Sequence, residues 1–403
     1  MRDPSDKVSR LIPPRIEHRI EPRSEAAPAM HFTAADHAHM AAALALAERG
    51  RNTTHPNPRV GCVLVREGVV VGEGFHARAG GPHAEVVALE AAGAAARGAT
   101  VYVTLEPCGH QGRTPPCTEA LIEAGVAEVV APIVDPNPKV AGRGFAALER
   151  AGIKVRHGLM VAPATALNAG FIKRMRHGRP FVRLKVGMSL DGRVALASGE
   201  SRWITGPEAR RDAQALRARS DAIVTGIGTV LADDPALTAR DAEDRPLERQ
   251  PLRVVLDGAL RLPADARLLT EPGRTLVFTA ARDAHHASEL SEAHAEIRAL
   301  PAMPSESGVR LDLEALLDAL GEREINEVLI EAGPTLAGAF VAARLVDELV
   351  LYMAPSLLGD SARAAFVLPA LASLDRKVAL EITELRAVGR DWRVTARLAP
   401  EAP

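Results

Sequence analysis

The residues that point most directly to chemistry are one histidine, one glutamate and two cysteines in the first third of the chain. His83 is followed two positions later by Glu85, and further on Cys108 precedes Cys117. One imidazole and two thiolates form a ligand set that suits Zn²⁺, and three protein ligands leave the fourth tetrahedral position open to water. Zinc lowers the pKa of such a water to about 7, so the set predicts a hydrolytic reaction at neutral pH.

Glu85 is predicted to carry protons rather than to bind the metal. A carboxyl group beside the activated water can accept its proton and pass it to a leaving amine, which requires a partly desolvated pocket. Other interpretations stay open at this point. A His-x-Glu pair occurs often by chance, and His110 as a fourth ligand would close the site into a structural one. Cys62, in the apolar run 60–65, is expected to be a core residue.

The spacing of the cysteines distinguishes this chain from nucleoside and nucleic-acid base deaminases. Those enzymes carry H-x-E followed by P-C-x-x-C, whereas eight residues separate Cys108 from Cys117 here. The insert carries His110 and Arg113. A guanidinium group can bind two phosphate oxygens at once, so a different, phosphorylated substrate is indicated.

These residues need an α/β layer to position them. Thr33, with an acid at Asp36, is typical of a helix N-cap. Helices are predicted over 36–48, 83–96, 118–124 and 142–151, and strands over 60–65, 69–74, 100–104, 128–133 and 153–155. The charged, Gly- and Pro-containing stretch 173–180 predicts a domain boundary.

A second α/β region follows the boundary. Strands are predicted over 181–188, 222–225, 253–256, 275–279, 327–330 and 348–353, and helices over 207–218, 311–320 and 335–343. A G-x-G-x-x-G dinucleotide fingerprint is missing from the sequence. Two glycine-bearing turns, 225–230 and 330–338, each follow a strand and open a helix. Each is either a phosphate-binding helix N-terminus, with Pro334 near N1, or an ordinary turn.

Composition limits the class of function. The 403 residues predict two to three domains, and 49 basic against 51 acidic residues give 49 − 51 = −2. This charge and the 3% of aromatic residues argue against nucleic-acid binding. We also expect no membrane span and no secretion signal. Three cysteines cannot form a disulfide framework, which favours a reducing cytoplasm. Residues 1–30, with five Pro and mixed charges, are expected to be a poorly ordered tail rather than a basic targeting peptide.

Residues 106–117, together with 55–61 and 72–76, resemble the bifunctional deaminase/reductase family of riboflavin biosynthesis. The resemblance implies that His83, Cys108 and Cys117 hold zinc and that Glu85 is the proton shuttle. It also implies that the pyrimidine and ribose-phosphate pocket is lined by Asn57, His76, His110 and Arg113. From the residues alone, Asn57 is equally a turn residue and His76 a polar residue at a strand end.

The second half is similar to the reductase part of that family over 185–195, 201–205, 217–237 and 331–338. The resemblance implies a dihydrofolate-reductase-like fold and NADPH as cofactor. The implied dinucleotide contacts are Gly187, Trp203, Thr229, Asp233, Gly258, Gly333, Pro334, Thr335, Leu336, Ala337, Gly338 and Ala339. The implied substrate contacts are Lys185, Ser201, Arg217, Leu237, Arg240 and Glu331. From the residues alone, Arg217 is equally part of a solvated helix face and Trp203 a core anchor.

We therefore expect a tail (1–30), a cytidine-deaminase-like three-layer α/β domain (31–177) and a dihydrofolate-reductase-like α/β domain (178–403). The expected function is hydrolytic deamination of a diaminopyrimidine ribose-phosphate, followed by NADPH-dependent reduction of its ribosyl group. The expected partners are small-molecule substrates, with a homo-oligomer and without nucleic acid or membrane. Two alternatives are a nucleoside or tRNA deaminase with an unrelated C-terminal domain, and a zinc-stabilised binding module without catalysis.

Overall fold

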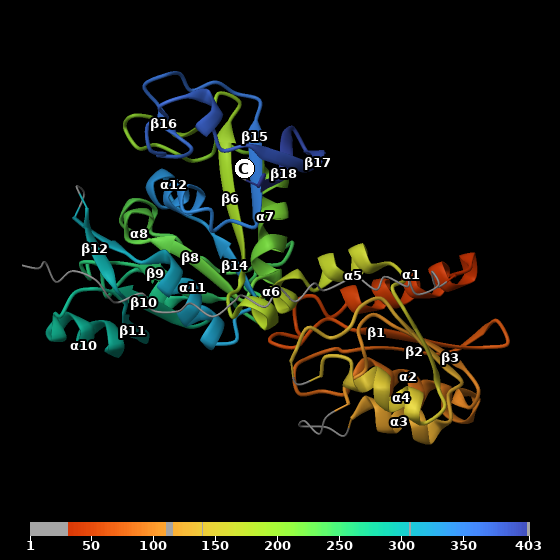
Figure 1. Ribbon diagram of the computed structural model, residues 1–403. Coiled ribbons are helices and arrows are strands. Elements are labelled where there is room, and N and C mark those ends of the chain that lie inside the picture. Colours follow the sequence, from red (N-terminus) through yellow and green to blue (C-terminus); the bar gives the residue numbers. More distant parts are fainter. Residues whose placement is uncertain (1–30, 110–115, 139, 306–307, 401–403) are drawn as a thin grey trace, which may run out of the picture. The chain divides into compact units, whose positions relative to one another are not determined.

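The computed structural model describes residues 31–400 except 110–115, 139 and 306–307 (Figure 1). It contains two large sheets, one built from the N-terminal half of the chain and one from the C-terminal half. The α/β class predicted from the sequence is confirmed. Among the described residues, no helix is both long and apolar enough to cross a membrane.

The N-terminal half forms a five-stranded sheet in the order β2-β1-β3-β4-β5. Strand β1 pairs antiparallel with β2 and β3, whereas β3, β4 and β5 run parallel. The strands are Gly61–Arg66 (β1), Val69–Phe75 (β2), Thr100–Val103 (β3), Glu128–Ala131 (β4) and Lys154–His157 (β5). The helices are Ala34–Glu48 (α1), Ala84–Ala92 (α2), Cys117–Ala124 (α3), Arg143–Arg150 (α4), Val161–Leu167 (α5) and Ala169–His177 (α6), and a 3-10 turn (η1) spans Gly93–Ala96.

Helices cover both faces of this sheet, which gives three layers (Figure 1). On one face α1 and α5 pack Met40 and Leu167 against Val63 and Tyr102. On the other face α2, α3 and α4 bury a separate cluster that includes Ala88, Leu121 and Leu148. A strand that is covered on both faces consists of nearly continuous apolar residues. Strand β1 is of this kind, because its first five residues are all buried.

The C-terminal half forms a nine-stranded sheet in the order β11-β10-β9-β8-β14-β6-β15-β18-β17. The strands from β11 to β15 in this order are parallel, and β18 and β17 add an antiparallel edge. The strands are Phe181–Ser189 (β6), Ala222–Gly226 (β8), Leu252–Leu256 (β9), Thr275–Thr279 (β10), Ala295–Ala299 (β11), Glu327–Ile330 (β14), Glu348–Ala354 (β15), Leu380–Val388 (β17) and Asp391–Leu398 (β18). Two small two-stranded sheets pair Ala302–Ser305 (β12) with Gly308–Leu311 (β13), and Arg193–Ala195 (β7) with Arg363–Ala364 (β16).

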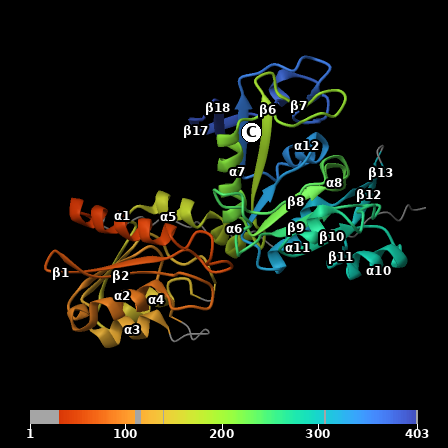
Figure 2. The ribbon, with the colours of Figure 1, turned by 180° about the vertical axis from the view of Figure 1, so that it is seen from behind.

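Alternate residues of the parallel strands point to opposite faces of the large sheet. On β8, Ala222 and Val224 join the core under α11 and α12, whereas Ile223 packs with Leu216 of α7. Figure 2 shows these elements from behind. The helices are Pro207–Arg219 (α7), Ile227–Asp233 (α8), Arg267–Thr270 (α9), Ala284–Glu292 (α10), Leu313–Glu322 (α11) and Pro334–Ala342 (α12), and a 3-10 turn (η2) spans Leu374–Arg376.

The structure corrects several predicted elements. The helix predicted over 83–96 ends at Ala92, because Gly93 takes a positive φ of 54° and the chain continues as a 3-10 turn. Within the stretch 173–180, where a domain boundary is predicted, α6 continues to His177 and Gly178 ends it with φ 72°. The edge strands β17 and β18 were not predicted, because the exposed outer strand lacks a continuous apolar run.

Candidate functional site

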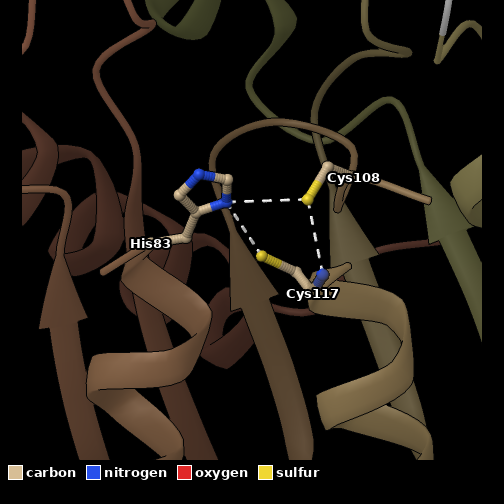
Figure 3. Close-up of side chains that lie close together, drawn as sticks. All are labelled: His83, Cys108 and Cys117. Carbon is tan, nitrogen blue, oxygen red and sulfur yellow. Dashed lines mark hydrogen bonds between the residues drawn. The ribbon is translucent and has the colours of Figure 1, made fainter. Parts of the chain in front are cut away.

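His83, Cys108 and Cys117 converge on one point, and their ligand atoms all lie within 4.8 Å of one another. His83 Nδ1 is 3.0 Å from Cys117 Sγ and 3.6 Å from Cys108 Sγ, and Figure 3 shows the three side chains directed at a common centre. No fourth ligand joins them within the part of the chain that the structure describes. One imidazole and two sulfurs at this separation fit Zn²⁺.

The ligands come from the ends of three segments at one edge of the sheet. His83 is the N-cap of α2, Cys117 is the first residue of α3, and Cys108 follows β3. The backbone N–H of Cys117 donates to Cys108 Sγ at 3.3 Å. This hydrogen bond and the positive end of the helix dipole at α3 favour the thiolate form of Cys108.

Two features fix the segments that carry the ligands: close packing next to His83 and a hydrogen-bonded carboxylate next to Cys108. On β2, a Cβ at Gly74 would lie 2.4 Å from the Ala84 carbonyl oxygen, so glycine allows the first turn of α2 to lie directly on the strand. On the other side, the buried Glu106 carboxylate anchors the segment that leads to Cys108. It accepts the backbone N–H groups of Asp135, Gly142, Gly144 and Phe145, at 2.8–3.3 Å.

Glu85 lies in the first turn of α2 and is buried, with 4% of its surface exposed. Burial, and next the charge of the nearby Cys108 thiolate, raise the pKa of Glu85 to about 7. A carboxyl group with such a pKa exchanges protons at neutral pH, as general acid–base chemistry requires.

The three cysteines have different surroundings. The pKa of the Cys108 thiol is lowered, because the Cys117 side chain donates to it and His83 lies beside it. Cys62 is fully buried in the apolar core of the five-stranded sheet, and this burial raises its pKa. The prediction of Cys62 as a core residue is confirmed.

Asn57 and His76 are brought together next to the metal ligands. Asn57 Nδ2 is 3.1 Å from His76 Nε2, and His76 Nδ1 is 2.9 Å from the Pro82 carbonyl oxygen. The His76 ring meets His83 edge to face, with 5.4 Å between centroids. Burial lowers the pKa of His76, so the neutral ring donates through Nδ1 to Pro82 and accepts from Asn57 through Nε2. His110 and Arg113 lie outside the described residues.

The C-terminal half contains a cleft of about 920 Å³, within the size range of cofactor pockets. Most of the predicted contacts line it: Lys185, Gly187, Ser201, Trp203, Arg217, Thr229, Asp233, Leu237, Gly258, Glu331, Gly333, Pro334, Thr335, Leu336 and Ala339. The two glycine-bearing turns lie side by side, because the Gly333 N–H donates to Thr229 Oγ1 at 3.1 Å. Gly333 is the N-cap of α12 and Pro334 is at N1, so this helix start fits a phosphate-bearing dinucleotide.

A buried ion cluster forms one wall of the cleft. Glu331 Oε1 is 2.6 Å from Arg217 Nε, and Glu331 Oε2 is 2.9 Å from Lys185 Nζ. Arg217 Nη1 also donates to the Thr238 carbonyl oxygen at 3.0 Å. Although burial opposes its ionisation, the two cations hold the pKa of Glu331 well below its usual range, so the cluster stays charged.

Three predicted residues do not line the cleft. Ala337 and Gly338 are buried within α12. The Arg240 guanidinium bonds to Thr238, Asp244 and Glu271 instead. Four arginines that sequence reasoning missed do line it: Arg202, Arg261, Arg310 and Arg363. Arg310 and Arg363 reach the cleft on the short strand pairs β12–β13 and β7–β16, which are not evident from the sequence.

Comparison with known proteins gives matches over both halves. Residues 180–394 match the RibD C-terminal domain, and residues 33–133 match the zinc-binding region of cytidine and deoxycytidylate deaminases. The chain is 54% identical to the riboflavin biosynthesis protein RibD of Escherichia coli, covering 88% of this chain and 97% of the relative. Its identity to RibD of Haemophilus influenzae is 47%, covering 91% of this chain and 98% of the relative.

Solved structures agree. Acinetobacter baumannii RibD matches with a TM-score of 0.84 and 45% identity, over 91% of this chain and 99% of that chain. A Thermotoga maritima diaminohydroxyphosphoribosylaminopyrimidine deaminase/5-amino-6-(5-phosphoribosylamino)uracil reductase matches with a TM-score of 0.80 and 34% identity, over 91% and 99%. A nucleoside or tRNA deaminase with an unrelated appendage is not favoured, since the C-terminal half matches RibD as well. The chain thus belongs to the RibD family of riboflavin biosynthesis and is a bifunctional enzyme, a zinc-dependent deaminase joined to an NADPH-dependent reductase.

Proposed function

We propose that the described sites carry the two reactions in sequence on one pyrimidine ribose-phosphate. The first removes an amine from 2,5-diamino-6-(5-phosphoribosylamino)pyrimidin-4(3H)-one by hydrolysis, and the second reduces the ribosyl group to ribityl. The convergence of His83, Cys108 and Cys117 beside the buried Glu85 carries the first assignment.

In the deaminase site, His83, Cys108 and Cys117 hold zinc, which supplies Lewis acidity and lowers the pKa of water. Glu85 accepts the proton of the attacking water and returns it to the amine, which leaves as ammonia. Asn57 and His76 orient the pyrimidine, because the His76 ring lies against His83 and Asn57 is hydrogen-bonded to His76. His110 and Arg113 remain predicted contacts to the ribose-phosphate.

Replacing Glu85 by Gln tests this assignment. We expect ammonia release to fall by at least 100-fold, because the amide cannot accept the proton, while one zinc per chain stays bound. The matched control is Glu90→Gln on the exposed side of the same helix, which leaves both properties unchanged. Near-normal ammonia release from Glu85→Gln would show that this carboxyl is not the proton shuttle.

In the reductase site, the cleft lined by Gly187, Trp203 and the turn 333–336 holds NADPH, which supplies the hydride. Thr229, Asp233, Gly258 and Ala339 complete the cofactor side. Lys185, Ser201, Arg217, Leu237 and Glu331 face the substrate, and Arg217 is a natural partner for its phosphate. Ala337, Gly338 and Arg240 remain predicted contacts that the geometry of the cleft does not support.

NADPH binding is measured by the change in its fluorescence when the full chain is added. We expect saturable binding that is tighter for NADPH than for NADH, because cationic side chains such as Arg202 and Arg261 line the cleft and favour the extra phosphate. Equal affinity for NADPH and NADH would contradict the proposal that the arginines of the cleft bind the extra phosphate of NADPH.

We propose that the chain works in the cytoplasm, where its thiol ligands stay reduced, and that it acts on small molecules without nucleic acid or membrane. The domain boundary falls after α6, at Gly178. A homo-oligomer is supported by the edge strand β17, where Leu380, Ile382 and Leu385 are exposed at the end of the sheet. Sedimentation measures the assembly directly, and a monomer at micromolar concentration would refute it.

A further inference from the structure

The segment 53–58, between α1 and β1, connects the deaminase centre to the nine-stranded sheet. At one end Asn57 contacts His76, whose ring lies against the zinc ligand His83. The backbone N–H of Asn57 donates to the Thr54 carbonyl oxygen at 2.8 Å, so the segment forms a tight turn. The position of Asn57 at the metal centre therefore depends on what holds this turn.

The other side of the turn is held by residues of the C-terminal half. The Pro56 carbonyl oxygen accepts from Asn326 Nδ2 at 2.9 Å, and His55 Nδ1 is 2.6 Å from Asp221 Oδ1. Asp221 and Asn326 immediately precede β8 and β14, the adjacent central strands of the large sheet. The two residues held by these contacts, His55 and Pro56, directly precede Asn57 in the chain.

The residues that hold the turn are themselves fixed. Asn326 is 2% exposed, its Oδ1 accepts from Arg174 Nε at 2.6 Å, and its backbone N–H donates to Asp221 Oδ2 at 2.8 Å. A buried amide with both ends bonded has one preferred orientation, because turning it leaves a donor or acceptor unpaired.

A buried ion pair secures the exit of the turn. Arg59 Nη2 is 2.7 Å from Glu327 Oε1 and 3.1 Å from His55 Nε2, and Arg59 Nη1 donates to the Leu167 carbonyl oxygen. The Arg59 and Glu327 side chains are each 6% exposed. Desolvated charges hold their partners firmly, since separation leaves a buried charge uncompensated.

We propose that Asn326 is a positioning residue for deamination. Through its bond to the Pro56 carbonyl oxygen it fixes the turn that places Asn57 against His76, so a side chain of the reductase half sets the shape of the deaminase pocket. This inference rests on the proposed role of Asn57 and His76 in binding the pyrimidine.

The test is Asn326→Ala in the full-length, zinc-loaded enzyme. Deamination is followed by ammonia release from the diaminopyrimidine ribose-phosphate, and reduction by NADPH oxidation with the deaminated intermediate. We expect the KM of deamination to rise roughly tenfold, because loss of the contact lets Asn57 move. We expect the reductase constants to stay within about twofold and zinc to stay at one per chain. The matched control is Lys173→Ala, which removes the contact of α6 with Asp347 but leaves the turn intact, and should alter neither KM.

The double variant separates positioning from a general structural role. If Asn326 acts through Asn57, then Asn326→Ala adds no further KM increase to an Asn57→Ala enzyme. The proposal is overturned if the two substitutions multiply each other's effect on the KM of deamination. It is also overturned if Asn326→Ala lowers both activities equally and lowers the Tm. If Asn57→Ala raises the KM and Asn326→Ala does not, the inference fails while the site assignment stands. If neither changes it, the assigned role of Asn57 fails as well.

Discussion

Glu106 offers a quantitative test of how the metal centre is built. Its carboxylate is 3% exposed and accepts four backbone N–H groups, two of them from Gly144 and Phe145 in the first turn of α4. It therefore occupies the positive end of that helix and fixes the chain two residues before the zinc ligand Cys108. The perturbation is Glu106→Gln, which keeps the shape but replaces one acceptor oxygen by an NH₂ group.

The cost follows from the hydrogen bonds. The amide nitrogen faces two of the four N–H groups, which then lose their acceptor. At about 1–3 kcal/mol for each buried donor left unsatisfied, we expect a loss of roughly 4 kcal/mol of folding free energy. If about a third of this free energy is lost from zinc binding, because Cys108 is displaced, the loss is about 1.4 kcal/mol. Zinc then binds about tenfold more weakly, since 1.4 kcal/mol corresponds to a factor of ten in the binding constant.

Zinc affinity is measured by competition with a chromogenic chelator, and unfolding by circular dichroism in urea. Both tryptophans, Trp203 and Trp392, lie in the C-terminal half, so their fluorescence reports that half as an internal reference. The control is Glu128→Gln, whose carboxylate binds Arg156 and Lys154. It should lower stability without weakening zinc. Wild-type zinc affinity and wild-type unfolding of Glu106→Gln would together refute the reasoning.

Two further predictions concern buried carboxylates. In Glu331→Gln, Arg217 and Lys185 lose their shared counter-charge, so we expect the KM of reduction to rise roughly tenfold, with deamination in the same protein unchanged; a loss of both activities would contradict this. Hydrogen bonds from the Arg156 side chain hold the pKa of Asp36 well below its usual range, so this stabilisation is present above about pH 4 and is lost as the pH falls further. Asp36→Asn should therefore cost about 1–2 kcal/mol at pH 7 and less at pH 3, measured by urea unfolding, and an equal cost at both pH values would refute the charge-based explanation.

Local sequence was sufficient for the chemistry of the deaminase centre. Residue type and order predicted His83, Cys108 and Cys117 as ligands. They converge because two of them lie at helix starts and Cys108 lies in the segment that follows β3, at one edge of the sheet. Hydrophobic patterns predicted the central strands of both halves, because strands buried on both faces are continuous apolar runs. The Thr33 cap was also predictable, since a capping box needs only residues three positions apart.

Contacts between distant segments were decided only by the tertiary structure. Arg240 is a predicted substrate contact, but its guanidinium bonds to Glu271, thirty-one residues away, and Arg240 is not among the residues that line the cleft. Arg310 and Arg363 reach the cleft on short strands whose pairing is set by the rest of the fold. The contact of Asn326 with Pro56 joins residues 270 positions apart. Spacing along the chain encodes helix faces, strand faces and caps, whereas partners across the molecule depend on how the two sheets and their loops pack, which no local pattern specifies.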